Sequence, residues 1–180
     1  MGGMHSAVTI ARPVGEVFRF FLDLDRNAPK TDPRIESVVR SPEGPSGQGT
    51  TFRLRQGPPG KRRETITRFS AVEPERRLCF DAVIGPMRPR CVLEFHQTLK
   101  GTRVEFSGHS NPIGPLRLLS SAFDRKGQRI WDQRLARIKA VLEAPGTGGA
   151  VTDPRPLKEE RVEAMHPLAK PPRPAQEPSW

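Results

Sequence analysis

The pattern of apolar residues changes from the spacing of strands to that of a helix near Pro112, and that change limits the folds the chain can adopt. Between residues 35 and 110, six segments of β-branched or alternating composition are separated by turn-forming residues. After Pro112, apolar residues recur every three or four positions as far as Leu142, which is the spacing of an amphipathic helix. A series of strands followed by one long helix predicts an α+β fold in which the helix covers one face of an antiparallel sheet.

The predicted elements follow from these segments and from the N-terminal region. Strands are expected over residues 35–40, 50–55, 63–72, 78–84, 90–99 and 103–110. A seventh strand over 8–11 precedes them, and it is followed by a helix over 13–25 with the apolar face Val14, Val17, Phe18, Phe21 and Leu22. Residues 26–33 are rich in turn formers and leave room for one short helix at most.

The final helix is predicted over residues 116–143. Its apolar stripe consists of Leu116, Leu119, Phe123, Ile130, Leu135, Ile138 and Leu142. Gly127 lies near the middle, where it lowers helix stability by about 1 kcal/mol relative to alanine and permits a bend or a break.

Two hairpins can be paired by counting residues. If the turn 85–89 closes between Ile84 and Cys91, Phe80 faces Phe95. If residues 100–101 form a two-residue turn, Phe95 faces Phe106. The two pairings together predict a row of three phenylalanines on the apolar face of a meander.

The same register separates the two cysteines. It places Cys79 opposite His96, whereas Cys91 lies about five positions further along the ladder, roughly 17 Å away. A disulfide requires Cα atoms within about 7 Å, so we expect none. A zinc site is not expected either, because these residues and His109 fall on different faces and include no Cys-x-x-Cys pair. His96 is predicted to pair with Glu105 on the outer side of the sheet.

Composition separates a part of the chain that can fold from a part that cannot. Residues 145–180 hold eight of the 20 prolines and few large apolar side chains, so we predict a disordered tail there and a folded domain over 1–144. The tail is electrically balanced, which assigns the net charge of +10 to the folded part. No segment is long and apolar enough to span a membrane, and the N-terminus carries no export signal. We therefore expect a cytoplasmic protein.

Several short segments, in their order and spacing, carry a resemblance to a known superfamily. They are residues 8–18, 32–35, 47–50, 72–78 and 135–143. The chain resembles the START-related SRPBCC superfamily, in its bacterial polyketide cyclase/dehydrase-like branch. The resemblance implies the helix-grip fold, in which a curved antiparallel sheet of about seven strands wraps around a long C-terminal helix and leaves a ligand cavity between them. In one departure, Thr31 stands where many members carry a tryptophan before the Asp-Pro pair.

Combined with the predicted register, the implied fold selects candidate residues for the cavity wall. From the sheet these are Phe52, Leu54, Phe80, Ala82, Leu93, Phe95, Gln97, Val104 and Phe106, and from the helix Leu119, Phe123 and Ile130. Gln97 is the polar residue that the pairing places inward, where it could orient a ligand carbonyl or hydroxyl. Arg68 points inward if the even-numbered residues of its strand, such as Ile66, face the core. It points outward if the odd-numbered residues, such as Phe69, do. The same residues could equally pack a solid core, which is favoured for the deepest of them.

The resulting first hypothesis is the binding of a hydrophobic or amphipathic small molecule, such as a lipid, a polyketide or an aromatic compound. The alternative is an enzyme of the polyketide cyclase/aromatase kind, in which Gln97, Arg68 or His109 positions substrate oxygen atoms. His109 also fits a turn that precedes a helix cap. No nucleophile elbow, phosphate loop or dinucleotide fingerprint is present in the sequence, and we expect neither a cofactor nor a metal.

A third hypothesis rests on the basic surface. Arginines and lysines surround the hairpin at residues 57–60, where they could attract nucleic acid or anionic lipid. The sequence contains no helix-turn-helix, zinc-finger or aromatic-basic motif, so we do not expect a nucleic-acid partner. An interaction module that uses this basic rim is the second alternative.

Overall fold

A computed structural model describes residues 3–58 and 60–145 of the chain. The predicted tail therefore lies outside the described residues, apart from its first position. The elements, in order, are β1 (Met4–Ile10), α1 (Val14–Leu22), α2 (Leu24–Thr31), β2 (Ile35–Ser41), β3 (Thr51–Gln56), β4 (Arg63–Glu73), β5 (Arg77–Val83), β6 (Arg90–Thr98), β7 (Gly101–His109), the 3-10 helix η1 (Gly114–Leu119) and α3 (Ser120–Glu143).

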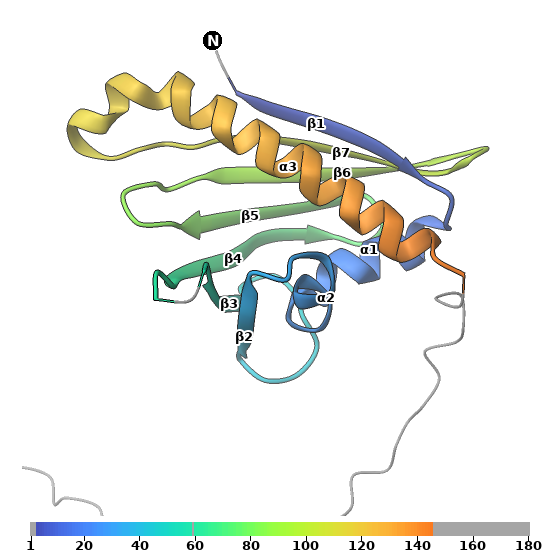
Figure 1. Ribbon diagram of the computed structural model, residues 1–180. Helices are drawn as coiled ribbons and strands as arrows, with labels where there is room; N and C mark the ends of the chain where they lie inside the picture. Colours follow the sequence, from blue (N-terminus) through green and yellow to red (C-terminus); the bar gives the residue numbers. More distant parts are fainter. Residues whose placement is uncertain (1–2, 59, 146–180) are drawn as a thin grey trace, which may run out of the picture. The chain divides into compact units, whose positions relative to one another are not determined.

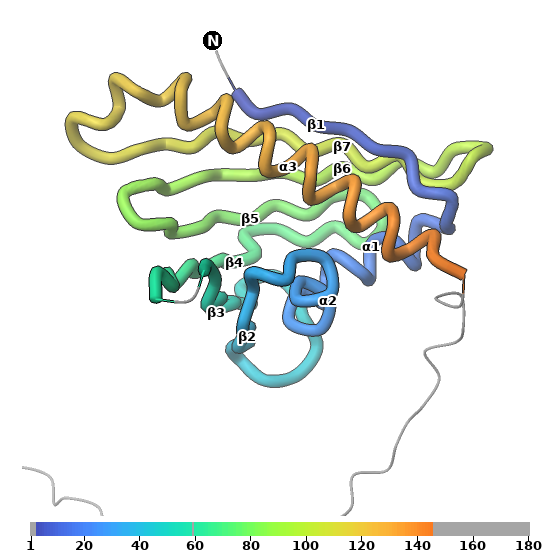
Figure 2. Tube along the Cα trace, in the orientation of Figure 1, coloured from blue at the N-terminus to red at the C-terminus, as the bar shows by residue number. Residues whose placement is uncertain are grey.

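The strands form one antiparallel sheet in the order β1-β7-β6-β5-β4-β3-β2, and the long helix α3 runs along one of its faces (Figure 1). Strands β2 to β6 each pair with the next strand in the sequence, and the last strand, β7, pairs with β1 at the edge of the sheet (Figure 2). This arrangement is the α+β helix-grip fold that the sequence predicts, with all seven strands confirmed.

The predicted register is wrong in both hairpins, although the predicted face is right. In β6 and β7, Leu93 pairs with Phe106 and Phe95 with Val104, because the turn consists of residues 99–100 instead of 100–101. Gly101 takes up the positive φ of 119° that this turn requires. The pairing differs from the prediction by two positions. An even shift leaves every side chain on its predicted face.

The β5–β6 hairpin differs by four positions. Phe80 pairs with Cys91, and no continuous row of three phenylalanines forms across these strands. The same ladder continues to a bridge between Ile84 and Met87, so the hairpin closes at the two-residue turn 85–86 and not at the predicted turn over 85–89. Met87 also forms a bridge with Pro112, just before η1, which residue counting did not anticipate.

This register also corrects the position of the cysteines. Cys79 pairs with Val92, so it lies one position away from Cys91 along the ladder and on the opposite face of the sheet. Both cysteines are free. The predicted separation of about five positions is wrong, and the opposite faces give the physical reason why no disulfide joins them.

Helix α3 continues through Gly127 without a break. A Cβ atom at this position would collide with the Sδ atom of Met4 in β1. The glycine therefore allows the helix to pack closely on the first strand. Side chains of α3 also bond to the outer backbone edge of β1: Gln128 to His5, and Lys139 to the carbonyl oxygen of Thr9 at 2.6 Å.

The core lies between the sheet and the helices. Phe18 and Phe21 of α1 pack edge-on against Phe95 of β6, with ring centroids 5.2 and 5.4 Å apart. Leu135 and Ile138 of α3 join the same buried cluster. Among the described residues, no helix is both long and apolar enough to cross a membrane.

Candidate functional site

The concave face of the sheet presents most of the predicted lining residues to α3. The deepest of them have at most 4% of their surface exposed and belong to one core cluster: Phe52, Leu54, Leu93, Phe95, Val104 and Phe106. Ala82 is also buried. Their inward orientation agrees with the prediction, and their role as ligand contacts stays a prediction.

The same face is less completely covered beside the first half of α3. Phe80 of β5 and Trp131 of α3 pack against the core cluster but remain half-buried, and Phe123 is half-buried as well. Trp131 stacks on Phe106, with ring centroids 3.9 Å apart and planes inclined by 16°. Its centroid lies 5.9 Å from that of Phe80. Together these rings form a partly exposed aromatic surface between helix and sheet, which we call the aromatic groove.

Arg134 lies one helical turn beyond Trp131. Its guanidinium carbon is 5.0 Å from the centroid of the Trp131 ring, the geometry of a cation–π contact. Burial lowers the pKa of Arg134, and the nearby Asp32 carboxylate acts in the opposite direction. In the described part of the chain, no ion pair or hydrogen bond is formed by this guanidinium.

Asp32 faces Arg134 from the connection between α2 and β2. Its carboxylate accepts hydrogen bonds from Nε and Nη2 of Arg34 at 2.9 and 2.7 Å, and Nη1 of Arg137 lies 3.8 Å away. The hydrogen bond from Arg34 holds the pKa of Asp32 below its usual value, despite a side chain that is only 5% exposed. The arginines and Asp32 line a narrow gap that has no room for a water molecule, together with Thr31, Ile130 and Gln133.

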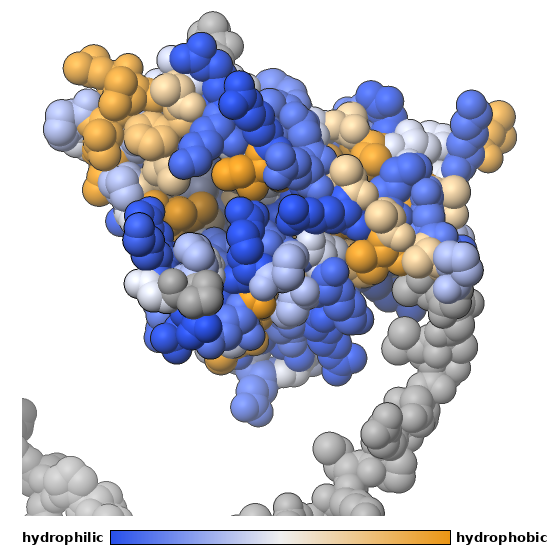
Figure 3. Space-filling view, in the orientation of Figure 1, coloured by the Kyte–Doolittle hydropathy of each residue, from blue (hydrophilic) through white to orange (hydrophobic). Residues whose placement is uncertain are grey.

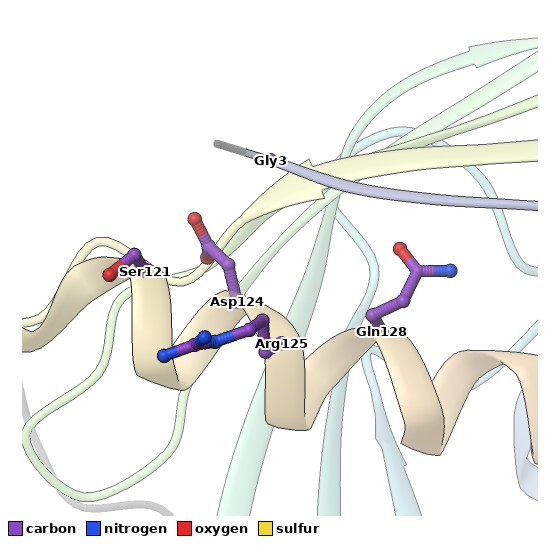
Figure 4. A pocket seen from close by; sticks show the side chains of 5 residues that line it. All are labelled: Gly3, Ser121, Asp124, Arg125 and Gln128. Carbon is purple, nitrogen blue, oxygen red and sulfur yellow. The ribbon is translucent and has the colours of Figure 1, made fainter. Parts of the chain in front are cut away.

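A second hollow lies on the other flank of α3, beside the start of β1. It measures about 270 Å³ and is lined by Gly3, Ser121, Asp124, Arg125 and Gln128 (Figure 4). Asp124 is buried here, and its carboxylate accepts a hydrogen bond from the backbone N–H of Ser110 at 2.8 Å, which offsets the cost of burying the charge. The polar lining and the bond to Ser110 indicate a structural contact that fixes the beginning of the helix.

Two predicted lining residues of the helix are misplaced. Leu119 is 52% exposed and Ile130 is 39% exposed. The N-terminal part of the predicted stripe is rotated because the contact of Gly127 with Met4 and the bond of Asp124 to Ser110 turn a different face of this part of α3 toward the sheet. Exposed apolar side chains instead gather on and beside η1, where hydrophobic colour is concentrated in Figure 3, and they are Ile113, Leu118 and Leu119.

The polar candidates of the sequence also lie outside the groove. Gln97 is exposed, and its Oε1 accepts the backbone N–H of Val14 at 3.0 Å while its Nε2 donates to the carbonyl oxygen of Gly101. Gln97 therefore joins α1 to the β6–β7 turn. Arg68 is exposed on the outer face, because the odd-numbered residues of its strand, Thr65, Thr67 and Phe69, point inward. His109 is exposed at the end of β7. The hypothesis that these three residues position substrate oxygens in the groove is wrong.

Cys91 is the buried nucleophile candidate nearest to the groove. Burial raises the pKa of its thiol to about 12, and the charge of Arg134 only partly opposes this. The thiolate is the reactive form of cysteine, so Cys91 is unreactive near neutral pH.

One cluster on the outer face has donor atoms close enough to share a metal ion: Glu94, His96 and Glu105. The register places His96 opposite Arg103 and Glu94 opposite Glu105, so His96 and Glu105 do not face each other as predicted. Both lie on the predicted outer face. Arg103 bonds to Glu105 at 2.6 Å and lowers the pKa of that carboxyl, and the charge of His96 contributes to lowering it. These residues lie on the face opposite the groove, so they take no part in it.

Comparison with known proteins assigns the family. The family model described as polyketide cyclase/dehydrase and lipid transport matches residues 1–143. The chain belongs to this family. A search of the curated proteins found no match. The residues that match the polyketide cyclase/dehydrase and lipid transport family include the whole sheet and helix α3, the part of the chain that forms the groove.

Solved structures share the fold at low sequence identity. The structure titled Ara h 8.0201 has a TM-score of 0.65 and 18% identity, with 79% of this chain and 99% of that chain covered. A protein from Nitrosomonas europaea has a TM-score of 0.62 and 18% identity, over 78% and 93%. The di-domain ARO/CYC BexL, from the BE-7585A biosynthetic pathway, has a TM-score of 0.65 and 18% identity, over 79% of this chain and 47% of that one. These similarities show the helix-grip fold.

The sequence prediction missed the two residues that distinguish the groove, Trp131 and Arg134. The spacing of apolar residues contains a signal for Trp131. Stepping back from Leu142, Ile138 and Leu135 in intervals of three and four residues leads to Trp131 and then to Gly127. The prediction followed Phe123 and Ile130 instead because it weighed hydrophobicity above continuity of spacing.

Proposed function

We propose that this protein binds a hydrophobic or amphipathic small molecule in the aromatic groove. The observation that carries the proposal is the half-buried pair Phe80 and Trp131, which leaves aromatic surface exposed at one end of an otherwise filled helix-grip core. Partly exposed aromatic rings with one nearby polar anchor are typical of ligand sites. We place this activity in a folded domain over residues 1–144 that works in the cytoplasm.

The family description supports binding of apolar compounds, since it names polyketides and lipids. A cyclase-like reaction has less support from the site. The three residues proposed to orient substrate oxygens lie outside the groove, and the Cys91 thiol is protonated near neutral pH. Binding is therefore the function that the geometry favours.

N-phenyl-1-naphthylamine, an uncharged aromatic fluorophore, tests the proposal in the full chain. We expect saturable binding with one molecule per protein chain and a rise in fluorescence as the fluorophore leaves water. The variant Trp131→Ala should bind it about tenfold more weakly, because a stacked aromatic contact and its buried area are lost.

The matched control is Leu118→Ala, which removes an apolar side chain that is 90% exposed on η1. Its affinity should stay within about twofold of the unmodified chain. Near-ultraviolet circular dichroism shows that both variants are folded. Absence of saturable binding, or equal losses in the two variants, contradicts the proposal.

A further inference from the structure

The geometry points to an amphipathic anion as the ligand, with an apolar body in the aromatic groove and a carboxylate or equivalent acidic group on Arg134. This inference rests on the proposed function and specifies its ligand class. It follows from the charge, the position and the accessibility of the residues around the narrow gap.

Charge is unbalanced at this gap. Three guanidinium groups, those of Arg34, Arg134 and Arg137, surround the single carboxylate of Asp32. Arg34 and Arg137 both contact that carboxylate, whereas Arg134 is half-buried without an ion pair in the described part of the chain. A desolvated cation with an unused bonding capacity is unfavourable by itself, and an anion that pairs with it removes this penalty.

The position of Arg134 joins this charge to the apolar surface. Its guanidinium lies against the Trp131 ring, and Trp131 in turn stacks on Phe106. A guanidinium stacked on an aromatic ring keeps its N–H edge free for a planar acidic group. A ligand whose apolar part lies beside Trp131 and Phe80 therefore has its polar end within reach of Arg134.

Access to the site requires side-chain movement. The gap has no room for a water molecule, but its outer wall consists of two long arginine side chains, Arg34 and Arg137, which are 58% and 46% exposed. Exposed side chains change rotamer within nanoseconds. Arg34 is held to Asp32 by two hydrogen bonds, so the acidic group can enter when Arg137 swings toward the solvent, and Arg137 can then contribute a further donor.

Two fluorophores with the same ring skeleton test the inference. 1-Anilinonaphthalene-8-sulfonate carries a sulfonate, whereas N-phenyl-1-naphthylamine does not. We expect Arg134→Gln to weaken the sulfonate about tenfold, because a charge-assisted hydrogen bond is lost. The same variant should weaken the neutral compound by a clearly smaller factor than the sulfonate, because only the sulfonate pairs with the charge of Arg134. The sulfonate affinity of the unmodified chain should also fall as salt is added.

Arg129→Gln is the matched control, since it removes the same charge from an exposed position of the same helix. It should leave the affinities for both compounds within about twofold. Arg134→Lys keeps the charge and should retain more sulfonate binding than Arg134→Gln, which separates charge from packing. Equal effects of Arg134→Gln and Arg129→Gln on sulfonate binding, or equal losses for both compounds in Arg134→Gln, overturn the inference while leaving the proposed function intact. Failure of the neutral compound to bind the unmodified chain overturns both.

Discussion

The two halves of helix α3 face the same sheet but are covered very differently. In the C-terminal half, Leu135, Ile138 and Leu142 are at most 5% exposed and join the rings of α1 in the core. In the N-terminal half, Trp131 and Phe123 remain half-buried and Ile130 is 39% exposed. The difference follows from the position of α1, which packs against β6 and β7 and fills the concave face at one end (Figure 1).

The comparison shows how one helix can serve two purposes in this fold. Where α1 completes the packing, apolar side chains contribute to the free energy of folding because they are removed from water. Where no second layer covers the sheet, aromatic side chains retain exposed surface that another molecule can cover. Stability and binding should therefore respond to different substitutions along the same helix.

The largest expected effect is on the filled half. Leu135→Ala removes a side chain that is 1% exposed, and it should lower the free energy of unfolding by about 3 kcal/mol through lost burial and the cavity left behind. Ile130→Ala, in the open half, should lower it by less than about 1 kcal/mol. Urea denaturation of both variants measures the contrast. Equal losses would mean that the two halves are packed alike.

A smaller effect is expected where α2 and β2 meet α3. Asp32→Asn should lower the free energy of unfolding by about 2 kcal/mol at neutral pH, because the carboxylate loses its charged hydrogen bonds to Arg34. The pKa of Asp32 is held below its unfolded value of 3.8, so this contribution is present above pH 3.8 and is lost as the pH falls through the folded pKa.

Urea denaturation over a series of pH values checks this second prediction. The difference between the unmodified chain and Asp32→Asn should shrink as the pH falls below 3.8. A difference that stays constant across this range would show that the ion pair does not depend on the charge of Asp32.

The third prediction concerns the thiols and compares the two faces of the sheet. Cys79 is half-buried on the outer face, whereas Cys91 is 4% exposed on the inner face with a pKa raised to about 12. In the variant Cys91→Ser, the remaining thiol should react with Ellman's reagent in the folded state; in Cys79→Ser, it should react only after denaturation. Rapid labelling in Cys79→Ser would show that the filled face opens readily.

The last prediction is the alkaline consequence of that raised pKa, which develops only well above neutral pH. The folded chain keeps Cys91 protonated above the ordinary thiol value of 9.0, whereas the unfolded chain does not, so stability should fall as the pH rises from 9.0 toward about 12. Cys91→Ala should show a shallower decline than the unmodified chain in denaturation at alkaline pH. Identical slopes would contradict the assignment.

The sequence was sufficient for the fold because periodicity is a local property. The alternation of apolar residues from 35 to 110 identifies the strands and their inner face, and the spacing around Leu135 identifies the helix. The register was not accessible in this way, because the β5–β6 hairpin closes at a two-residue turn beside Met87, and Met87 also bridges Pro112, a contact between distant residues.

The candidate site was harder to predict for the same reason. The face of α3 that meets the sheet is set by Gly127 against Met4 and by Asp124 against Ser110, which are long-range contacts. Gln97 lies on the inner face of β6 by the alternation of side chains. The first residue of α1, Val14, lies beside it there and donates its backbone N–H to the Gln97 amide oxygen. Hydrophobicity alone therefore favoured Ile130 over the half-buried Trp131 beside it.

The most direct test of the account uses the fluorescence of Trp131 itself. The chain contains two tryptophans, so Trp180→Phe leaves Trp131 as the sole emitter. When N-phenyl-1-naphthylamine saturates this variant, we expect the Trp131 emission to be almost completely quenched by energy transfer to a fluorophore in contact with it. Saturable binding with the Trp131 emission unchanged would place the ligand away from the aromatic groove and contradict the account.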